Sequence, residues 1–354
     1  MSPANAIVQT VANRLWLRDQ RQLRIADRLL STVDPPQHRS RVRRPGGPHG
    51  ARWPGFRSIL CAIDFSEQSR LALRYAAAIA SRRRGTLRVV YVNDPLLTRA
   101  AAVALNDREL VARSAVALRA FVEATVSAGT RRALRITRQV ENGNPTAEIM
   151  AAADAAGADL IVVGTHGLTG ARRLLLGSTT GQLLRQTSIP VLAIPRVRKR
   201  RVGALLSSWP GQRIVAAIEL GGHGAAEVDV AAQIARSFNS SLVAVHVVPH
   251  MIKPAWLGAI VSRHKADHAA HARRRLAALV NRLSSPVRID ARVISGHVAD
   301  GLVAFALRER ASLVVVALQG RRGSWLDRRG SIAYGVLVHA ATPVLAYPTA
   351  WHPR

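Results

Sequence analysis

The chain contains one alternation of short apolar strands and Ala-rich helices twice, and this duplication limits the possible folds more than any other feature. In the first copy, β-branched runs lie at 58–63, 87–92, 134–140, 160–163 and 191–194. Helical stretches lie between them at 67–81, 109–128, 146–156 and 178–186. Near-continuous apolar strands joined by helices are typical of a parallel sheet covered on both faces. This copy is therefore predicted to be a doubly wound five-stranded α/β domain.

The same pattern returns after a basic segment. The segments 213–219, 242–248, 313–316 and 342–347 match 57–64, 87–92, 160–163 and 189–194 in order. The distance along the chain is also kept, since Asp64 to Gly164 is 100 positions and Glu219 to Ala317 is 98. A duplication of this length predicts two similar domains packed as an intramolecular pseudo-dimer.

These patterns divide the chain into five parts. We predict a basic N-terminal extension, a helix followed by a disordered linker, at 1–56. The first domain covers 57–195, a basic linker 196–212, the second domain 213–348 and a C-terminal tail 349–354.

Positive charge dominates the composition. Lys and Arg number 51 against 21 Asp and Glu, a formal net charge of +30, and only three of the basic residues are lysines. Such a charge attracts nucleic acid, anionic membrane surfaces or phosphorylated ligands, although a GC-rich genome produces the same arginine excess without any partner. Aromatic residues, at 4%, are too few for base-stacking platforms. At most, we expect weak non-specific binding to nucleic acid or an anionic surface.

The only cysteine, Cys61, lies in an apolar run, so no intrachain disulfide can form and a buried, inert thiol is expected. No apolar run is long enough to span a membrane, and arginines interrupt any signal-peptide core near the N-terminus. The sequence therefore predicts a cytoplasmic protein without a transmembrane segment.

The candidate site lies at the carboxyl ends of the strands of the first domain. Ligands of open α/β sheets bind at this edge, where the crossovers diverge. Asp64 follows the first strand there, and the fourth strand ends at Gly164. The chain then reads Gly164-Thr-His-Gly167, nine residues, and Gly177-Ser178-Thr179-Thr180. Glycines and the amides of a helix N-terminus favour a closely held anion, so a phosphate chain is the predicted ligand.

With these residues the chain resembles the universal stress protein family, whose nucleotide-binding members carry G-x-x-G, nine residues and G-[S/T]. The segments Ile63-Asp64-Phe65-Ser66 and Gly143-Asn144-Pro145 add to the resemblance. It implies an adenine nucleotide, ATP with Mg²⁺, in the first domain. In this family the last strand often forms the subunit contact, so the resemblance also implies that strands 191–194 and 344–347 pair with each other within the chain. Asp64 and Val92 would then contact adenine and ribose, and the phosphates would be held by Gly164, Gly167, Gly177, Ser178 and Thr180. His166, inside the loop, either contacts phosphate or hydrogen-bonds the turn.

The second domain departs from this motif. Its loop reads Ala317-Leu-Gln-Gly320, nine residues, and Gly330-Ser331, so alanine replaces the first glycine. Glu219 replaces the aspartate, and Val247 lies in the strand that matches the one containing Val92. Two interpretations stay open: a second nucleotide site built from Glu219, Val247, Gly320, Gly330 and Ser331, or a degenerate copy that serves as the built-in dimer partner.

Several chemistries lack their motif. The chain has no P-loop lysine motif, nucleophile elbow or H-E-x-x-H. Three histidines share one helix face at 264, 268 and 271, but neighbouring arginines oppose a cation there, so we predict no metal site. We expect a regulatory ATP-binding protein that acts through domain pairing, an unknown protein partner or a homodimer, and that has no catalytic residues. The alternatives are a slow nucleotide hydrolase and an Arg-rich nucleic-acid-associated protein with a vestigial pocket.

Overall fold

The computed structural model describes residues 53–95, 107–165, 176–196, 209, 211–249, 258–283, 285–318 and 332–353, with backbone alone for 107–108 and 258–266. The predicted N-terminal helix and most of both basic linkers lie outside these ranges, as do His166, Gly167, Gly320, Gly330 and Ser331.

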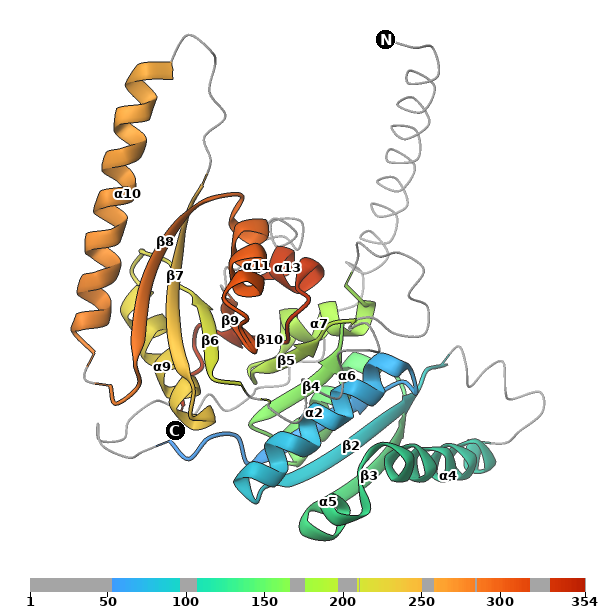
Figure 1. Cartoon of the computed structure of the whole chain (residues 1–354). Coiled ribbons are helices and arrows are strands. Elements are labelled where there is room, and N and C mark those ends of the chain that lie inside the picture. Colours follow the sequence, from blue (N-terminus) through green and yellow to red (C-terminus); the bar gives the residue numbers. More distant parts are fainter. Residues whose placement is uncertain are drawn as a thin grey trace, which may run out of the picture. The chain divides into compact units, whose positions relative to one another are not determined.

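All ten strands of the described residues belong to one sheet (Figure 1). The first half contributes β1 (Ser58–Ile63), β2 (Thr86–Asn93), β3 (Arg135–Asn142), β4 (Leu160–Gly164) and β5 (Val191–Ile194). The second half contributes β6 (Arg213–Ala217), β7 (Ser241–Pro249), β8 (Ile289–Gly296), β9 (Leu313–Leu318) and β10 (Val344–Pro348). The strand order is β3-β2-β1-β4-β5-β10-β9-β6-β7-β8, so each half has the same doubly wound order.

The halves join through their last strands. β5 and β10 run antiparallel, with Leu345 opposite Leu192, whereas every other neighbouring pair of strands in the sheet is parallel. The predicted pairing of the last strands is confirmed. Two parallel sheets thus form one mixed sheet within a single chain.

Helices cover both faces of each half, as the strand–helix alternation predicts. Those of the first half are α2 (Glu67–Arg83), α4 (Asp107–Thr125), α5 (Ala128–Ala133), α6 (Pro145–Ala155) and α7 (Ser178–Gln186). Those of the second half are α9 (Gly224–Phe238), α10 (Gly258–Asn281), α11 (Val298–Arg308) and α13 (Ile332–His339). The helix predicted at 109–128 ends earlier, at Thr125, and a short helix that was not predicted follows it, because the Ser127 side chain accepts the Thr130 N–H and starts α5.

Local sequence explains where several helices begin and end. The Ser66 hydroxyl caps α2 by accepting the Ser69 N–H, and the Asn144 side chain caps α6, with Pro145 in the first turn. Arg84 and Asn239 end α2 and α9 in the left-handed conformation, at equivalent positions of the two halves.

The core is continuous across the junction on one face of the sheet. There α2 and α9 contribute to a single cluster of buried residues, and Trp209 lies between Tyr75 and Phe238 with ring centroids 4.8 and 5.5 Å away. On the opposite face each half has its own cluster. Leu176 of the first half is an exception, because it belongs to the cluster that contains Val336 and Val344 of the second half.

Cys61 is buried and free, and burial raises the pKa of its thiol, so it is inert as predicted. Within the described residues, no helix combines the length and apolar character that a membrane span requires.

Candidate functional site

Three adjacent strands bring the predicted first-half residues to one edge of the sheet. β1 lies between β2 and β4, with Ile63 opposite Tyr91 and Cys61 opposite Val162. The carboxyl ends of these parallel strands therefore meet, and Asp64, Val92 and Gly164 all lie at that edge. Asp64 and Gly164 are partly exposed, whereas Val92 is buried among apolar neighbours.

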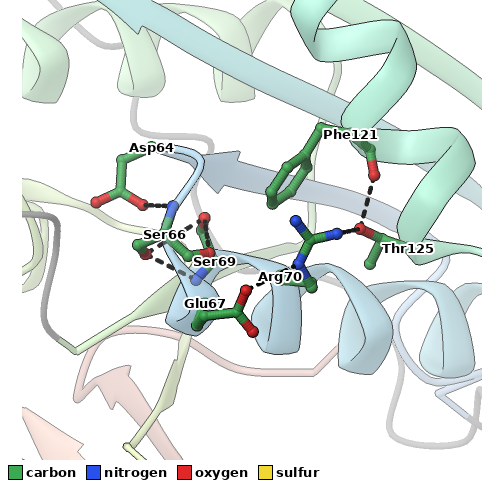
Figure 2. A network of polar contacts seen from close by, with 7 residues as sticks. All are labelled: Asp64, Ser66, Glu67, Ser69, Arg70, Phe121 and Thr125. Atoms are coloured by element: carbon green, nitrogen blue, oxygen red, sulfur yellow. Dashed lines mark hydrogen bonds and ion pairs between the residues drawn. The ribbon is translucent and has the colours of Figure 1, made fainter.

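The turn from β1 into α2 contains Asp64 and has a strained backbone at the next residue, Phe65. The Asp64 carboxylate accepts the Ser66 N–H at 3.0 Å, closing a local turn (Figure 2). Between them, Phe65 has φ +63°, a left-handed conformation that is rare for a bulky residue and costs of the order of 1–3 kcal/mol. Strain of this kind persists only where surrounding contacts impose it, and it gathers at functional sites.

Those contacts come from aromatic packing and a polar network. The Phe65 ring lies 4.5 Å from Tyr91 and 5.5 Å from Phe121, measured between centroids. Arg70 of α2 lies over the Phe121 ring at 4.6 Å and donates to the Thr125 hydroxyl at 3.1 Å, which joins α2 to α4 (Figure 2). The turn that presents Asp64 is thus fixed from both helices.

Two hydrogen bonds join the end of β4 to the start of α7. The Thr180 hydroxyl donates to the Gly164 carbonyl at 2.8 Å, and the Gly177 N–H donates to the Thr165 carbonyl at 2.8 Å. Gly177 is the N-cap of α7 and has no side chain to cap it, so Ser178 is the first helical residue. Ser178 therefore does not act as the helix N-cap, and the start of α7 lies beside the end of β4.

Sequence reasoning missed a polar chain at the end of β2. Asn93 is fully buried, its amide donates to Asn142 at 2.8 Å, and it accepts from the Ser114 hydroxyl at 2.9 Å. The Gly143 N–H donates to the Asn93 carbonyl. Gly143 has φ +149°, and a side chain at this position would meet the Glu148 carboxylate, so glycine is required here. An asparagine that ends an apolar strand was the available signal.

The second half brings Glu219 and Val247 to the matching edge. They line a pocket of about 50 Å³ together with Ala317, which lies near the carboxyl end of β9. The pocket also contains Glu227 of α9, a residue that sequence reasoning missed. Its side chain is 3% exposed, and its Oε2 accepts the Glu219 N–H at 2.7 Å.

Burial raises the pKa of Glu227 to about 6, and the nearby charge of Glu219 acts in the same direction. The hydrogen bond from the Glu219 N–H and the proximity of His223 act against this shift. The two halves therefore differ in charge at equivalent edges.

The described residues contain no group of three His, Cys, Asp or Glu side chains that could hold a metal ion.

Comparison with known proteins identifies the family. The sequence model of the Universal stress protein family matches twice, over residues 55–195 and 211–348. The chain belongs to the universal stress protein family.

Relatives match one or both halves. A universal stress protein of Mycolicibacterium smegmatis is 27% identical over 300 residues, covering 81% of this chain and 95% of its own length. The universal stress protein MJ0577 of Methanocaldococcus jannaschii is 24% identical over 172 residues, covering 40% of this chain and 96% of its own. The first of these therefore has the tandem length, and the second has the length of one half.

A solved structure supports the tandem fold. A universal stress protein from Archaeoglobus fulgidus matches with a TM-score of 0.56 at 20% identity, over 83% of this chain and 97% of its own. The predicted α/β fold of two universal-stress-type halves is confirmed.

Proposed function

We propose that this universal stress protein is an ATP-binding regulator whose nucleotide site lies in the first half. The proposal rests chiefly on one observation: Asp64, Gly164 and the start of α7 meet at the carboxyl edge of the sheet, around a backbone strained at Phe65. The intact glycine motif of this half adds to it. Asp64 and Val92 would contact the nucleoside, and the backbone from Gly164 to Ser178 the phosphates.

The start of α7 suits an anion for a physical reason. The first amides of a helix have no partner within the helix, and the helix dipole places partial positive charge there. Gly177 has no side chain with which to cap these amides. Thr180 acts differently, because its hydroxyl donates to the Gly164 carbonyl and so joins α7 to the end of β4.

Magnesium would enter with the nucleotide. Mg²⁺ usually keeps several waters and binds phosphate oxygens with one or two carboxylates. Asp64 is assigned to the nucleoside, so Mg²⁺ would be held chiefly by the phosphate oxygens and water, and the described residues offer no cluster of His, Cys, Asp or Glu side chains for it.

The regulatory output would pass to the second half through α7. Leu176, directly before Gly177, packs in a cluster with Val336 of α13 and Val344 of β10. The chain continues from α7 into β5, which pairs with β10. Nucleotide bound at the start of α7 would therefore bias the packing of the junction and the surface that a protein partner meets.

The test begins with freshly purified full-length protein. Denaturation and chromatography identify any nucleotide released, and calorimetric titration of the emptied protein with Mg-ATP measures affinity. We expect Asp64→Ala to weaken binding by at least about tenfold, which is 1.4 kcal/mol. The matched control is Asp154→Ala, on the exposed part of α6, which should leave affinity unchanged.

Equal affinity of Asp64→Ala and the control, or no binding of any adenine nucleotide, would contradict the proposal. Phosphate release in the same samples tests slow hydrolysis, because a rate that disappears in Asp64→Ala would indicate an enzyme.

A further inference from the structure

The second half contains a pocket whose chemistry differs from that of the nucleotide edge. Its volume is about 50 Å³, and it lies where β6, β7 and β9 end, beside the first residues of α11 and α13. The walls are mostly aliphatic and include Ile218, Val245, Val247, Val298 and Val316. Such a wall suits an apolar group and offers nothing to a phosphate.

The polar groups of the pocket are hydrogen-bond acceptors. Glu227 lines it, is 3% exposed, and uses Oε2 to accept the Glu219 N–H. Its Oε1 is buried and finds no hydrogen-bond partner among the described residues. A buried polar atom without a partner is unfavourable for the fold, so a ligand that donates to Oε1 supplies a hydrogen bond that the described residues do not provide.

His246 contributes a second acceptor. Its Nδ1 lies 2.9 Å from the Ile218 carbonyl, and because a carbonyl only accepts, Nδ1 carries the proton. In the neutral ring Nε2 is then an acceptor. Glu219 also lines the pocket and adds a further carboxylate.

The fold itself does not require this carboxyl group. Glu227 lies eight residues after Glu219, and eight residues after Asp64 the first half has Ala72, which is fully buried. A methyl group thus suffices at this position of an otherwise equivalent helix. The second half carries a buried acid where its twin carries none.

We propose that the second-half pocket binds a small apolar amine or amidine, with its N–H groups donated to Glu227. An amidinium matches a carboxylate in charge and in the fork of two N–H donors, and its apolar body matches the aliphatic walls. This site goes beyond the nucleotide site of the first half, and either one can fail without the other.

The probe is benzamidine, and acetophenone, which has a similar shape but no N–H donor, is the control ligand. Methyl NMR of the full-length protein labelled at valine follows both halves at once. We expect benzamidine to shift Val247, Val298 and Val316 and to leave Val92 in place, and we expect acetophenone to shift none of them.

Two variants test the role of Glu227. Glu227→Gln removes the charge but keeps an oxygen for the Glu219 N–H, so the fold should persist while benzamidine binds at least about tenfold more weakly. Ala317→Leu narrows the pocket from a partly exposed position without touching Glu227, and it should also abolish binding.

Equal affinity for benzamidine in wild type and Glu227→Gln would overturn the proposal. Shifts confined to Val92 and its neighbours, equal shifts with acetophenone, or no shifts at millimolar benzamidine would also overturn it. If Glu227→Gln fails to fold, unchanged benzamidine binding in Ala317→Leu still contradicts the pocket.

Discussion

The two turns that lead from the first strand of each half into its helix start from the same plan and have diverged. In the first half, Asp64 closes a local turn, Phe65 is strained and Ser66 caps α2. In the second half, the chain passes through Gly221 and Gly222, and the N-cap of α9, His223, makes no side-chain cap bond. Glu227 supports that turn instead, from inside the helix.

This difference shows how a duplicated fold can keep its sheet while changing its site. The strand order and register of the halves are equivalent, because the apolar strands fix them. The turns at the carboxyl edge lie outside the strand ladders that set the register, so their sequence can differ between the halves while the sheet stays the same. At the first-half edge, Asp64 is partly exposed and lies near the start of α7. At the second-half edge, Glu227 is buried and lines an apolar pocket.

The largest expected effect comes from breaking the core that both halves share. Trp209 is 5% exposed, packs between Tyr75 and Phe238, and donates its indole N–H to the Ser312 carbonyl at 2.9 Å. We expect Trp209→Ala to lower the free energy of unfolding by about 3–5 kcal/mol. Calorimetry should then resolve two transitions, one for each half, where wild type shows one. A single transition at the wild-type temperature would contradict the shared core.

The second effect concerns the acid that distinguishes the second half. The pKa of Glu227 is about 6 when folded, against 4.5 as its ordinary value, so the folded state holds this proton more tightly. Protonation of the Glu227 carboxyl group therefore stabilises the folded state. This contribution is complete below about pH 4.5 and is lost as the pH rises through 6. The shift corresponds to about 2 kcal/mol.

Denaturant unfolding between pH 4 and 7 measures this loss. Glu227→Gln should remove this loss of stability with rising pH. Compared with wild type, the variant should therefore be more stable at pH 7 than it is at pH 4. If wild type and Glu227→Gln have parallel pH profiles, Glu227 is not the buried acid that this account describes.

The fold was largely predictable from sequence, because buried parallel strands have near-continuous runs of β-branched and other apolar residues. β1 and β5 lie where predicted, and β2 and β3 run past their predicted ends to the polar residues Asn93 and Asn142, whereas no strand was predicted where β8 lies. The short helix α5 was missed, since it depends on a local cap at Ser127 and has no apolar pattern of its own.

The candidate site was predictable only in part. Asp64 and Gly164 follow from strand ends and glycine spacing, and the structure brings them to one edge. Glu227 was not predictable, because a glutamate in a helical pattern usually faces solvent. Its burial depends on the path of the Gly221-Gly222 turn, which is a tertiary property. The backbone strain at Phe65 likewise arises from packing against Tyr91 and Phe121.

The smallest effect concerns helix capping. Ser66→Ala removes the bond to the Ser69 N–H and should cost about 1 kcal/mol of stability. Gly221→Ala, at the matching position of the second half, meets no atom within 4 Å and should change stability by less than about 0.5 kcal/mol. Chemical denaturation of both variants compares the two turns, and equal losses would show that they do not differ in capping.

The stoichiometry of ATP binding tests the central claim most directly. Calorimetric titration of emptied full-length protein with Mg-ATP should give one nucleotide per chain, because only the first half pairs an intact glycine motif with an open, strained turn. Asp64→Ala should weaken this binding by at least about tenfold, and Glu219→Ala should leave it unchanged. Two nucleotides per chain, or loss of binding in Glu219→Ala alone, would contradict the divergence of the two halves.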